Sequence, residues 1–484
     1  MYARPKNIFG RIFSQTMNRA FFVFFLTLSG LSQAQEPWTL QKCIEEGLKK
    51  SVQIRQSELN LRNQQVSLEQ SKAAVLPTLN GQAANFYNVG RTIDRFTNQF
   101  ANSTVQSINM GLSTQFNLFN GMQNYYNIQQ NKINLAASLK DIDQSKNDIS
   151  LSVASAFLNI LLAREVYINN EKQVELTRQQ LERTRKLFEA GATPKANLLQ
   201  VEAQLANEEL TVVNAKNSVD LAILALSQLL MIENREGFDI SAPKTPEPDE
   251  MPLNFTASFV YSQALSNQPS LMSAELRTKS AEKGIQLSKS GLYPSLSFSG
   301  SIGTGYSGLA QKVIGVETRA VEAGFTQSGE TVFSVVADPI LQRTSYREQF
   351  GDNVNKSYGL VLTVPIFNNF QVRGNMSRSK IQYEQAKLNY EQTKINLKRT
   401  IEQAFADALA ALNRYKATKK SVEALREVFR NTEQRFNAGA ANPLEYNDSK
   451  TRLVAAESNL LQAKYDYVFR YKILDFYMGK AITL

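Results

Sequence analysis

The side chains that most often carry out chemistry in proteins are nearly absent from this chain of 484 residues. It has no histidine, which is the commonest general base and metal ligand. Cys43 is its single cysteine, so no disulfide framework can form, and its helical surroundings predict a small packed apolar residue. No phosphate-binding loop, dinucleotide fingerprint, nucleophile elbow or paired-cysteine metal motif occurs. These observations predict a protein that is not an enzyme and that holds no metal or cofactor.

The charge distribution argues against a nucleic-acid partner. The formal net charge is +10 at pH 7, from 54 Lys and Arg against 44 Asp and Glu. Four of the basic residues fall within the first 34, and the rest form no clustered basic patch of the kind that binds nucleic acid.

The first 34 residues predict a secretory signal peptide. Basic residues precede an apolar stretch from Ala20 to Leu31, and Ser32-Gln33-Ala34 offers small residues for cleavage before Gln35. An N-terminal membrane anchor is the alternative. Beyond this segment, we expect no apolar run near the roughly 20 residues of a membrane helix, so an exported chain would enter a membrane as a β-barrel.

The chain repeats itself, which bounds its architecture. Phe119-Asn120-Gly121 recurs as Phe367-Asn368-Asn369, and Phe188–Ala192 recurs as Phe436–Ala440 at the same spacing. We expect each copy to hold a helical run, a pair of strands, a very long helix and a returning helix. The predicted division is a signal peptide (1–34), a first repeat (35–232), a Pro-rich extended linker (233–252) and a second repeat (253–484).

Very long helices dominate both copies. No Gly or Pro occurs between Met122 and Glu189 or between Asn375 and Ala438, and shorter uninterrupted runs return at 195–236 and 444–478. At 1.5 Å per residue the longest would reach about 100 Å. Apolar residues recur every seventh position with the same phase in both copies, which favours supercoiled helices over an ordinary amphipathic bundle face. The outgoing helices carry Val153, Ile160, Tyr167, Val174, Leu181 and Phe188, with copies Ile401, Ala408, Tyr415, Val422, Phe429 and Phe436. The returning helices carry Leu198, Leu205, Val212, Val219 and Leu226, with copies Tyr446, Leu453, Leu460, Tyr467 and Leu474.

Each helix pair turns at the same short motif. The tips are Ala190-Gly191-Ala192 and Ala438-Gly439-Ala440, each followed by a proline, at 194 and 443. Gly permits the left-handed residue that ends a helix, and Pro suits the first turn of the next. The sequence therefore predicts two helical hairpins with tight tips.

Two strand pairs precede the long helices. Apolar and small polar residues alternate over about ten positions, which is the length and pattern of tilted membrane-spanning strands, although a soluble sandwich would alternate as well. The expected strands are 79–89, 108–118, 296–302 and 358–366. Four strands cannot close a membrane barrel, whereas three chains would supply twelve. The connection 91–104 is short and 307–355 is long, and long loops on such barrels face outside the cell.

The chain resembles the TolC family of outer-membrane efflux and secretion channels over essentially all of Gln35 to Leu484. The carriers of the resemblance are the duplicated strand pair, the Phe-Asn-Gly/Asn transition and the duplicated Phe-x-Ala-Gly-Ala tip. It implies a homotrimer with a twelve-strand β-barrel in outer-membrane lipid and an α-helical periplasmic tunnel. Such a channel is the passive exit duct of an efflux or type I secretion system. Its implied partners are a periplasmic adaptor, which meets the hairpin tips, and an inner-membrane pump.

The resemblance also implies a pore constriction near the tips. The matching acidic residues are Glu445 and Asp448, which threefold symmetry would arrange as two rings of carboxylates. Alternatively, both are solvated acids at a helix start, where the helix dipole favours them. The first repeat departs from the family with neutral Asn197 and Gln200, and Ala441 replaces the basic latch residue of some members. Closure would then use other contacts, with Arg183, Arg185 and Arg435 as candidates. The competing interpretation is a periplasmic coiled-coil adaptor without a membrane barrel.

Overall fold

The computed structural model describes residues 37–94, 96–98, 100–102, 104–233, 238–241, 243 and 246–483. The expected signal peptide, 1–34, lies outside the described residues. The chain divides into two compact units. The helical unit comprises residues up to Arg55 together with Gln144–Gln268 and Leu397–Leu484, and the sheet unit comprises Gln56–Asp143 and Pro269–Asn396.

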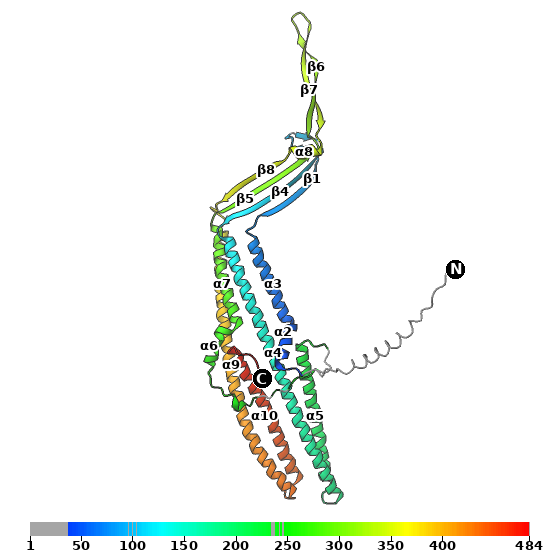
Figure 1. The fold of residues 1–484 in the computed structure, drawn as a ribbon, viewed down its shortest axis with the longest axis vertical. Helices are drawn as coiled ribbons and strands as arrows, with labels where there is room; N and C mark the ends of the chain where they lie inside the picture. Colours follow the sequence, from blue (N-terminus) through cyan, green and yellow to red (C-terminus); the bar gives the residue numbers. More distant parts are fainter. Residues whose placement is uncertain are drawn as a thin grey trace, which may run out of the picture. The chain divides into compact units, whose positions relative to one another are not determined.

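Two pairs of long helices confirm the duplication expected from the sequence (Figure 1). The helices are α2 (Leu40–Lys50), α3 (Val52–Ala73), α4 (Gln123–Glu189), α5 (Lys195–Leu229), α6 (Ala257–Asn267), α7 (Pro269–Lys289), α8 (Tyr346–Asp352), α9 (Gln371–Asn437) and α10 (Pro443–Tyr477), with 3₁₀ turns at Pro248–Glu250 and Ser290–Leu292. Helices α4 and α9 have 67 residues each, and α5 and α10 have 35 each. The lengths are equal because the residues that begin and end these helices recur at the same spacing in the two copies.

The sheet unit contains one four-stranded antiparallel sheet, in the order β1-β4-β5-β8. The strands are β1 (Thr78–Asn88), β2 (Arg91–Ile93), β3 (Phe100–Asn102), β4 (Val105–Asn120), β5 (Ser295–Ser307), β6 (Gln311–Phe325), β7 (Thr331–Arg343) and β8 (Asn355–Thr363). The two expected strand pairs are present, and β4 joins β5 so that one sheet includes both repeats. The outer edges of β1 and β8 have no strand partner among the described residues.

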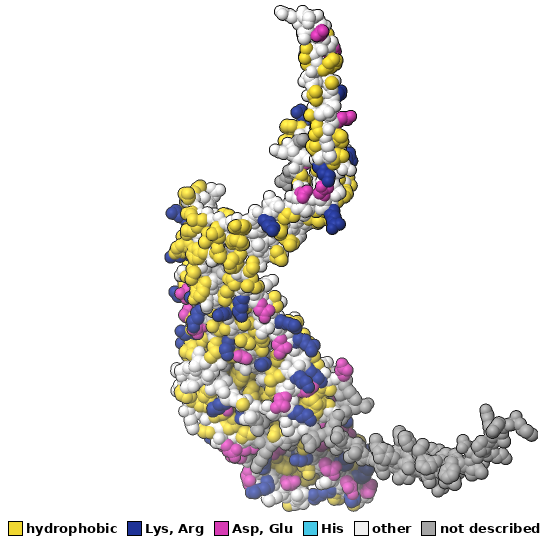
Figure 2. Space-filling model, turned by 45° about the horizontal axis from the view of Figure 1, so that its top comes forward, with side chains coloured by type: hydrophobic (Ala, Val, Ile, Leu, Met, Phe, Trp, Pro, Cys, Tyr) yellow, Lys and Arg dark blue, Asp and Glu magenta, His cyan; other side chains and the backbone are white. Residues whose placement is uncertain are grey.

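The connection 307–355 holds structure that the sequence analysis missed. Strands β6 and β7 form a separate two-stranded hairpin, and α8 follows it. In Figure 2, hydrophobic side chains lie along this hairpin, which extends from the part of the sheet unit that holds α8 (Figure 1). The four predicted strands of the sheet are present, but β6 and β7 were not predicted, because they alternate less regularly than the sheet strands and carry charges within them.

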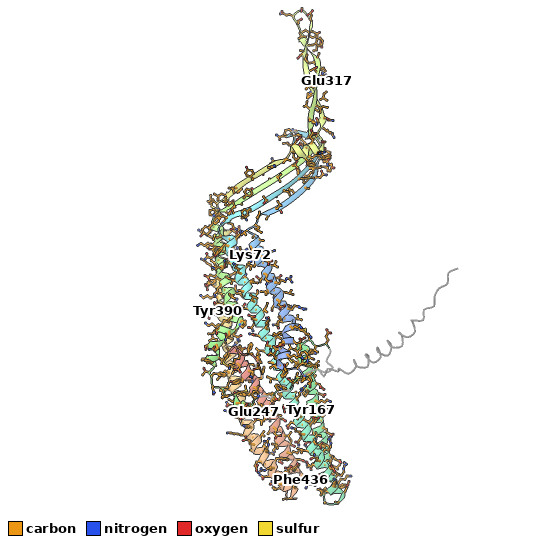
Figure 3. The ribbon with its side chains drawn as sticks, in the orientation of Figure 1. Lys72, Tyr167, Glu247, Glu317, Tyr390 and Phe436 are labelled. Carbon is orange, nitrogen blue, oxygen red and sulfur yellow. The ribbon has the colours of Figure 1, made fainter. Side chains whose placement is uncertain are left out.

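The heptad positions provide the packing surface of the long helices, as predicted. In the outgoing helices Val153, Ile160, Ile401 and Ala408 have no exposed surface, and Tyr415 retains 4%. In the returning helices the buried members are Leu226, Tyr446, Leu453, Tyr467 and Leu474. Figure 3 labels two further heptad residues, Tyr167 on α4 and Phe436 at the end of α9, and both are half-buried.

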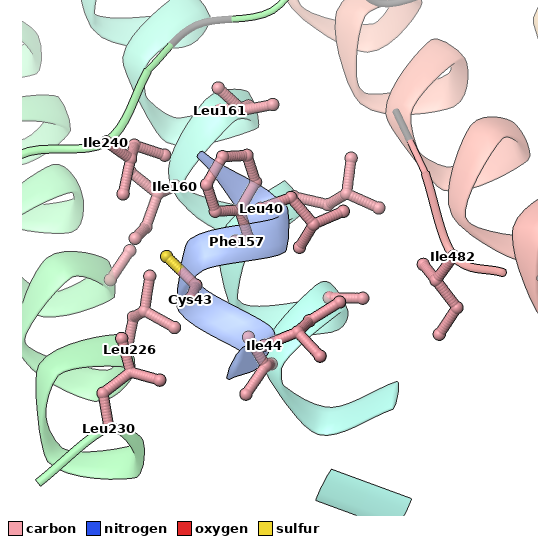
Figure 4. Close-up of a cluster of buried hydrophobic side chains, with 14 of the residues drawn as sticks. Leu40, Cys43, Ile44, Phe157, Ile160, Leu161, Leu226, Leu230, Ile240 and Ile482 are labelled. Carbon is pink, nitrogen blue, oxygen red and sulfur yellow. The ribbon is translucent and has the colours of Figure 1, made fainter. Parts of the chain in front are cut away.

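The main core of the helical unit joins the short helix α2 to α4 and α5 (Figure 4). Phe157 and Ile160 from α4 and Leu226 from α5 are fully buried there. Cys43 is also fully buried, and burial raises the pKa of its thiol to about 12. The prediction of a small packed apolar residue is confirmed.

Helix α4 corrects one sequence expectation. By length and composition it could cross a membrane, since it contains an 18-residue window with a mean hydropathy of 1.5, of which 33% is buried. The expectation that no such run follows residue 34 is therefore wrong by this criterion, which was applied to the described residues. We assign α4 to the core of the helical unit, because its Val153, Phe157 and Ile160 are fully buried there.

Two element ends differ from the prediction for local reasons. Helix α5 ends at Leu229, because Met231 takes a left-handed conformation with φ of 51° and its amide turns back to the carbonyl of Gln228. Strand β8 ends at Thr363, which pairs with Ser295, the first residue of β5, so the chain beyond it has no ladder partner. The linker expected at 233–252 packs in part, since Ile240 and Met251 are 2% and 8% exposed.

The transition from strand to long helix is built in the same way in both repeats. Gly121 and Met122 have φ of 63° and 68°, and their counterparts Asn369 and Phe370 have 50° and 60°. A β-carbon at Gly121 would come within 2.4 Å of the Ser290 carbonyl oxygen. Two successive left-handed residues thus turn the chain from strand into helix, and Gly and Asn are the residues that most readily adopt this conformation.

Candidate functional site at the helical hairpin tips

Both hairpin tips end their outgoing helix with the same capping motif. Gly191 and Gly439 have φ of 70° and 77°. The amides of Gly191 and Ala192 bond to the carbonyls of Phe188 and Leu187, and the corresponding bonds recur in the second repeat. This is the Schellman arrangement, in which a left-handed residue satisfies the last carbonyls of a helix. Apart from the glycine and its neighbours in the chain, no atom of the described residues lies within 4 Å of a β-carbon built on either glycine, so another backbone could approach the tips closely.

Glu445 lies in the first turn of α10 and has a clear structural role. Asn442 caps the helix by accepting from the Glu445 amide at 2.8 Å, and its own side-chain nitrogen lies 3.4 Å from Glu445 Oε1. The Arg435 guanidinium lies 3.5 Å from Glu445 Oε2, with side-chain exposures of 59% and 48%. The carboxylate is therefore accessible, and one cation from its own chain lies beside it.

Asp448 lies one turn further along α10. The Arg452 guanidinium lies 2.9 Å from Asp448 Oδ2, and both side chains are more than half exposed. Residues three apart on a helix share a face. The structure thus brings Glu445 and Asp448 to the same face of α10, each beside an arginine that weakens the negative field a carboxylate ring would create.

The first repeat has no acidic pair at the matching positions. Asn197 Nδ2 donates to Thr193 Oγ1 at 2.9 Å and supports the turn that leads into α5. Arg185 pairs with Glu202 at 3.4 Å, which joins α4 to α5 within the first hairpin. Arg435 likewise contacts its own hairpin. Of the three candidate arginines, Arg183 alone joins the two hairpins, through a hydrogen bond from its Nη1 to Asn437 Oδ1.

Further from the tips, α4 meets α10 through buried polar side chains. Gln180 and Asn447 are each 8% exposed, and Gln180 Nε2 lies 3.5 Å from Asn447 Oδ1. Their other amide atoms, Gln180 Oε1 and Asn447 Nδ2, are buried and have no hydrogen-bond partner in the described part of the chain. An unpaired buried polar atom costs about 1–3 kcal/mol. These two amides therefore hold the hairpins together weakly.

One turn along, a buried charge pair connects three helices. Lys450 of α10 is 3% exposed, and its Nζ lies 3.7 Å from Glu208 Oε1 of α5. Lys450 also donates to the Thr177 hydroxyl of α4, and that hydroxyl donates to Glu208 Oε2. Gln204 Nε2 donates to the same carboxylate at 2.7 Å. Burial lowers the pKa of Lys450, and the charge of Glu208 opposes that shift.

We call Thr177, Gln180, Glu208, Asn447 and Lys450 the polar seam. A cavity of about 300 Å³ adjoins it, and its lining residues include Glu208, Gln173 and Thr451. Buried ion pairs add little net stability, because the charges lose their hydration. Water that entered on separation would solvate every group in the polar seam. The arrangement therefore favours a contact that can open.

The sequence analysis did not find the polar seam, although a signal for it exists. Polar residues on α4 recur at 173, 177, 180 and 184, and this spacing places them along one side of a helix. The prediction for these helices rested on the apolar heptads instead. Among the described residues, no group of three or more His, Cys, Asp or Glu side chains could hold a metal ion.

Comparison with known proteins gives a consistent result. The family model described as outer membrane efflux protein matches residues 43–230 and 260–480. TolC of Escherichia coli is 23% identical over 459 residues, covering 92% of this chain and 82% of TolC. The pyoverdine export outer membrane protein OpmQ of Pseudomonas aeruginosa is 21% identical, covering 75% of this chain and 68% of OpmQ.

Solved structures of similar proteins share the fold. CusC superposes with a TM-score of 0.72 at 17% identity, covering 91% of this chain and 92% of CusC. VceC of Vibrio cholerae superposes with a TM-score of 0.68 at 16% identity, covering 92% of this chain and 97% of VceC. The long helical hairpins and the antiparallel sheet therefore belong to a fold that these proteins share. The chain belongs to the outer membrane efflux protein family.

Proposed function

We propose that three copies of this chain assemble into a passive exit duct, with a shared twelve-stranded barrel in outer-membrane lipid and a helical tunnel in the periplasm. The observation that carries the proposal is the four-stranded sheet whose edge strands, β1 and β8, have no further strand partner among the described residues. In lipid each unpaired backbone group costs several kcal/mol, so an open sheet cannot stay there alone. Pairing β8 of one copy with β1 of the next satisfies both edges.

The duct performs no catalysis in this proposal and requires no cofactor. Its partners are a periplasmic adaptor and an inner-membrane pump, as befits relatives named for efflux and for pyoverdine export. The adaptor meets the tips at Ala190-Gly191-Ala192 and Ala438-Gly439-Ala440, where the space beside Gly191 and Gly439 is open among the described residues. The family assignment favours this function over the alternative of a periplasmic adaptor without a barrel.

The tips provide the gate. Glu445 and Asp448 of three copies form two rings that favour cations, and their arginine neighbours moderate that preference. Closure uses the Arg183–Asn437 contact and the polar seam in place of the charged latch that the sequence lacks. Separation of the two hairpins along the polar seam opens the tunnel.

The internal repeat supports a distinction between two kinds of hairpin contact. At the spacing that relates Gly191 to Gly439, the counterparts of Gln180 and Asn447 are Val428 and Leu199. Both are 51% exposed in the single chain. In a trimer, Val428 on α9 faces Leu199 on α5 of the next copy. The contact between copies is then apolar, while the contact within a copy is polar and can open.

Cysteine cross-linking along the sheet edges tests the shared barrel. One cysteine replaces Asn80 on β1, and a second is moved along β8 through Ser357, Gly359 and Val361. Oxidation in isolated outer membranes is expected to link chains up to trimers for at least one β8 position. A cysteine in place of Gly300 on β5, which is paired on both sides, serves as the control and should give none. Monomers at every position would contradict the shared barrel.

A further inference from the structure

The β6/β7 hairpin is a large feature of the sheet unit that neither the fold nor the duct proposal explains. Its strands, of 15 and 13 residues, pair only with each other among the described strands. Ten large apolar side chains on it are at least 38% exposed: Val313, Ile314, Val316, Phe325, Val332, Phe333, Val335, Val336, Ile340 and Leu341. A lone two-stranded hairpin is marginally stable in water, so this surface requires a partner.

The base of the hairpin is firmly fixed. Gln349 of α8 is 3% exposed; it accepts from the Ser307 amide at 2.9 Å and donates to the Ser307 carbonyl at 3.0 Å, at the end of β5. Lys312 of β6 pairs with Glu348 of α8 at 2.6 Å, and the rings of Tyr306 and Tyr346 stack 3.9 Å apart. These contacts between α8, the end of β5 and the start of β6 set the direction in which the hairpin leaves the sheet.

The two faces of the hairpin differ in charge. The register pairs Glu317 with Asp338 and Arg319 with Val336, which places these residues on one face, where Arg319 and Asp338 lie 3.5 Å apart. Figure 3 labels Glu317 on β6. The opposite side, which we call the neutral face, consists of the cross-strand pairs Val316–Pro339, Thr318–Ala337 and Ala320–Val335.

Both edges of the hairpin are poor templates for an added strand. Strand β6 has irregular registers between Val313 and Gly315 and between Glu322 and Gly324. Strand β7 contains Pro339, which has no backbone N–H to donate. Bulges and proline are known protections of edge strands. A partner is therefore expected on a face of the hairpin rather than along an edge.

We propose that the neutral faces of three hairpins pack against one another around the axis of the trimer and cover the outer mouth of the duct. This inference rests on the proposed shared barrel, because three sheets closed into one barrel bring three hairpins to the same rim. Their attachment to that rim gives a high effective concentration, which favours association without a large interface per copy.

The charges select which face meets its copies. Glu317 and Asp338 are directly opposed acids, and identical copies of that face would bring four or more carboxylates together. The neutral face carries no charge over its three residue pairs, so identical copies meet without like-charge repulsion. Thr318, Ala320 and Ala337 are small and allow close approach around an axis. Glu322 lies opposite Phe333 at the turn end and marks the limit of this face.

Disulfide formation between hairpins tests the inference directly. The native Cys43 is fully buried, so it is not expected to form disulfides in this experiment. Val335→Cys places a thiol on the neutral face. The matched control is Val336→Cys, the next residue along β7, which places the thiol on the opposite, charged face. Oxidation of intact cells is expected to convert V335C to dimers, because three thiols around one axis can pair only two at a time. V336C should remain monomeric on the same non-reducing gel.

A second pair of variants distinguishes specific packing of the neutral faces from random collision of the hairpins. Ala320→Asp introduces a charge into the neutral face and is expected to abolish the V335C dimers, whereas Val321→Asp on the other face should leave them. Barrel cross-linking through the cysteines at Asn80 and on β8 is measured separately in the A320D and V321D variants. Barrel cross-links without V335C dimers would overturn the hairpin inference and leave the duct intact. Loss of both would overturn the duct itself.

Two further outcomes would also overturn the inference. Equal dimer formation by V335C and V336C would mean that the hairpins collide without a preferred face. Linkage of V335C to a protein of another mass would assign the neutral face to an extracellular partner instead of to copies of this chain.

Discussion

Lys450 Nζ of α10 lies 3.7 Å from Glu208 Oε1 of α5 at a site where the lysine is only 3% exposed. The residue that matches Lys450 in the first repeat is Glu202, which is acidic and forms an ion pair with Arg185 near the surface. Within the residues that the structure describes, the second repeat thus contributes a buried lysine to such a pair, whereas the first repeat has an exposed acid at the matching position. We attribute this asymmetry to the need for one hairpin contact that opens and one that does not.

Removing the cation should loosen the polar seam. Lys450→Ala leaves the Glu208 carboxylate buried without its cation, and loss of one partner of a buried pair costs about 3–5 kcal/mol. Single-channel conductance in planar bilayers is expected to show a larger open fraction for K450A than for the native protein. The double variant Lys450→Met with Glu208→Gln should return toward native behaviour. An unchanged open fraction in K450A would show that this pair does not hold the gate.

The polar seam should respond to alkaline pH. Burial lowers the pKa of Lys450 below its ordinary 10.5, so the unfolded chain binds more protons than the folded chain between the lowered value and 10.5. The free energy of unfolding should therefore rise with pH in that window. Burial raises the pKa values of Tyr446 and Tyr467 from 10.0 to about 12, so stability should fall again above pH 10. Glu208 and Thr177 are the polar groups that contact the ammonium.

Denaturant titrations from pH 7 to 11 measure this behaviour. Lys450→Met should lack the rise and keep the fall above pH 10. A native protein whose stability only declines across this range would be inconsistent with the assigned Lys450 environment.

Paired cysteines should distinguish the two hairpin contacts. Gln180→Cys with Asn447→Cys is expected to form a disulfide within one chain, which leaves the monomer mass on a non-reducing gel. Leu199→Cys with Val428→Cys, at the matching positions of the repeat, should link neighbouring chains up to trimers. The opposite result, with cross-links between chains for the first pair and within one chain for the second, would refute the claim that polar contacts lie within a copy and apolar contacts lie between copies.

The acids at the tip should control ion preference. Glu445→Gln and Asp448→Asn each remove three carboxylates from the proposed constriction, and the combined variant should lower the cation-to-anion permeability ratio several-fold. Bi-ionic reversal potentials give that ratio. Glu209→Gln is a suitable control, because Glu209 is an exposed acid on α5 away from the start of α10. If the combined variant and the control behave alike, Glu445 and Asp448 serve only to begin the helix.

The tip glycines should matter through backbone conformation alone. Gly439→Ala forces an L-residue to φ of 77° in otherwise open space, which costs about 1–2 kcal/mol. Differential scanning calorimetry of the detergent-solubilised protein should show a lower melting temperature. Ala440→Gly, at the next position, is the matched control with a smaller expected change. Equal melting of G439A and the native protein would mean that this tip is free to rearrange.

The sequence predicted the elements whose pattern is long and regular. Helices α4 and α9 were found because heptads such as Val153–Ile160 and Ile401–Ala408 hold one phase over many turns. The tips were found because Gly191 and Gly439 carry a known capping signature. The predicted pore acids remain a prediction, since they depend on an assembly of several chains. The repeat boundaries remain predictions as well.

The features that the sequence analysis missed depend on tertiary context. The hairpin of β6 and β7 escaped detection because Glu317 and Arg319 interrupt its apolar alternation. The burial of Lys450 could not be read from residue type, since an isolated lysine on a helix is usually solvated. Its partner Glu208 lies on another helix, and only packing brings the two together.

The claim that three chains share one duct is tested most directly by electron microscopy of the detergent-extracted outer-membrane protein. The account predicts threefold-symmetric tubes whose helical portion is about 100 Å long, as expected for helices of 67 residues. Single chains, or particles without threefold symmetry, would contradict the shared barrel and with it the proposed exit duct.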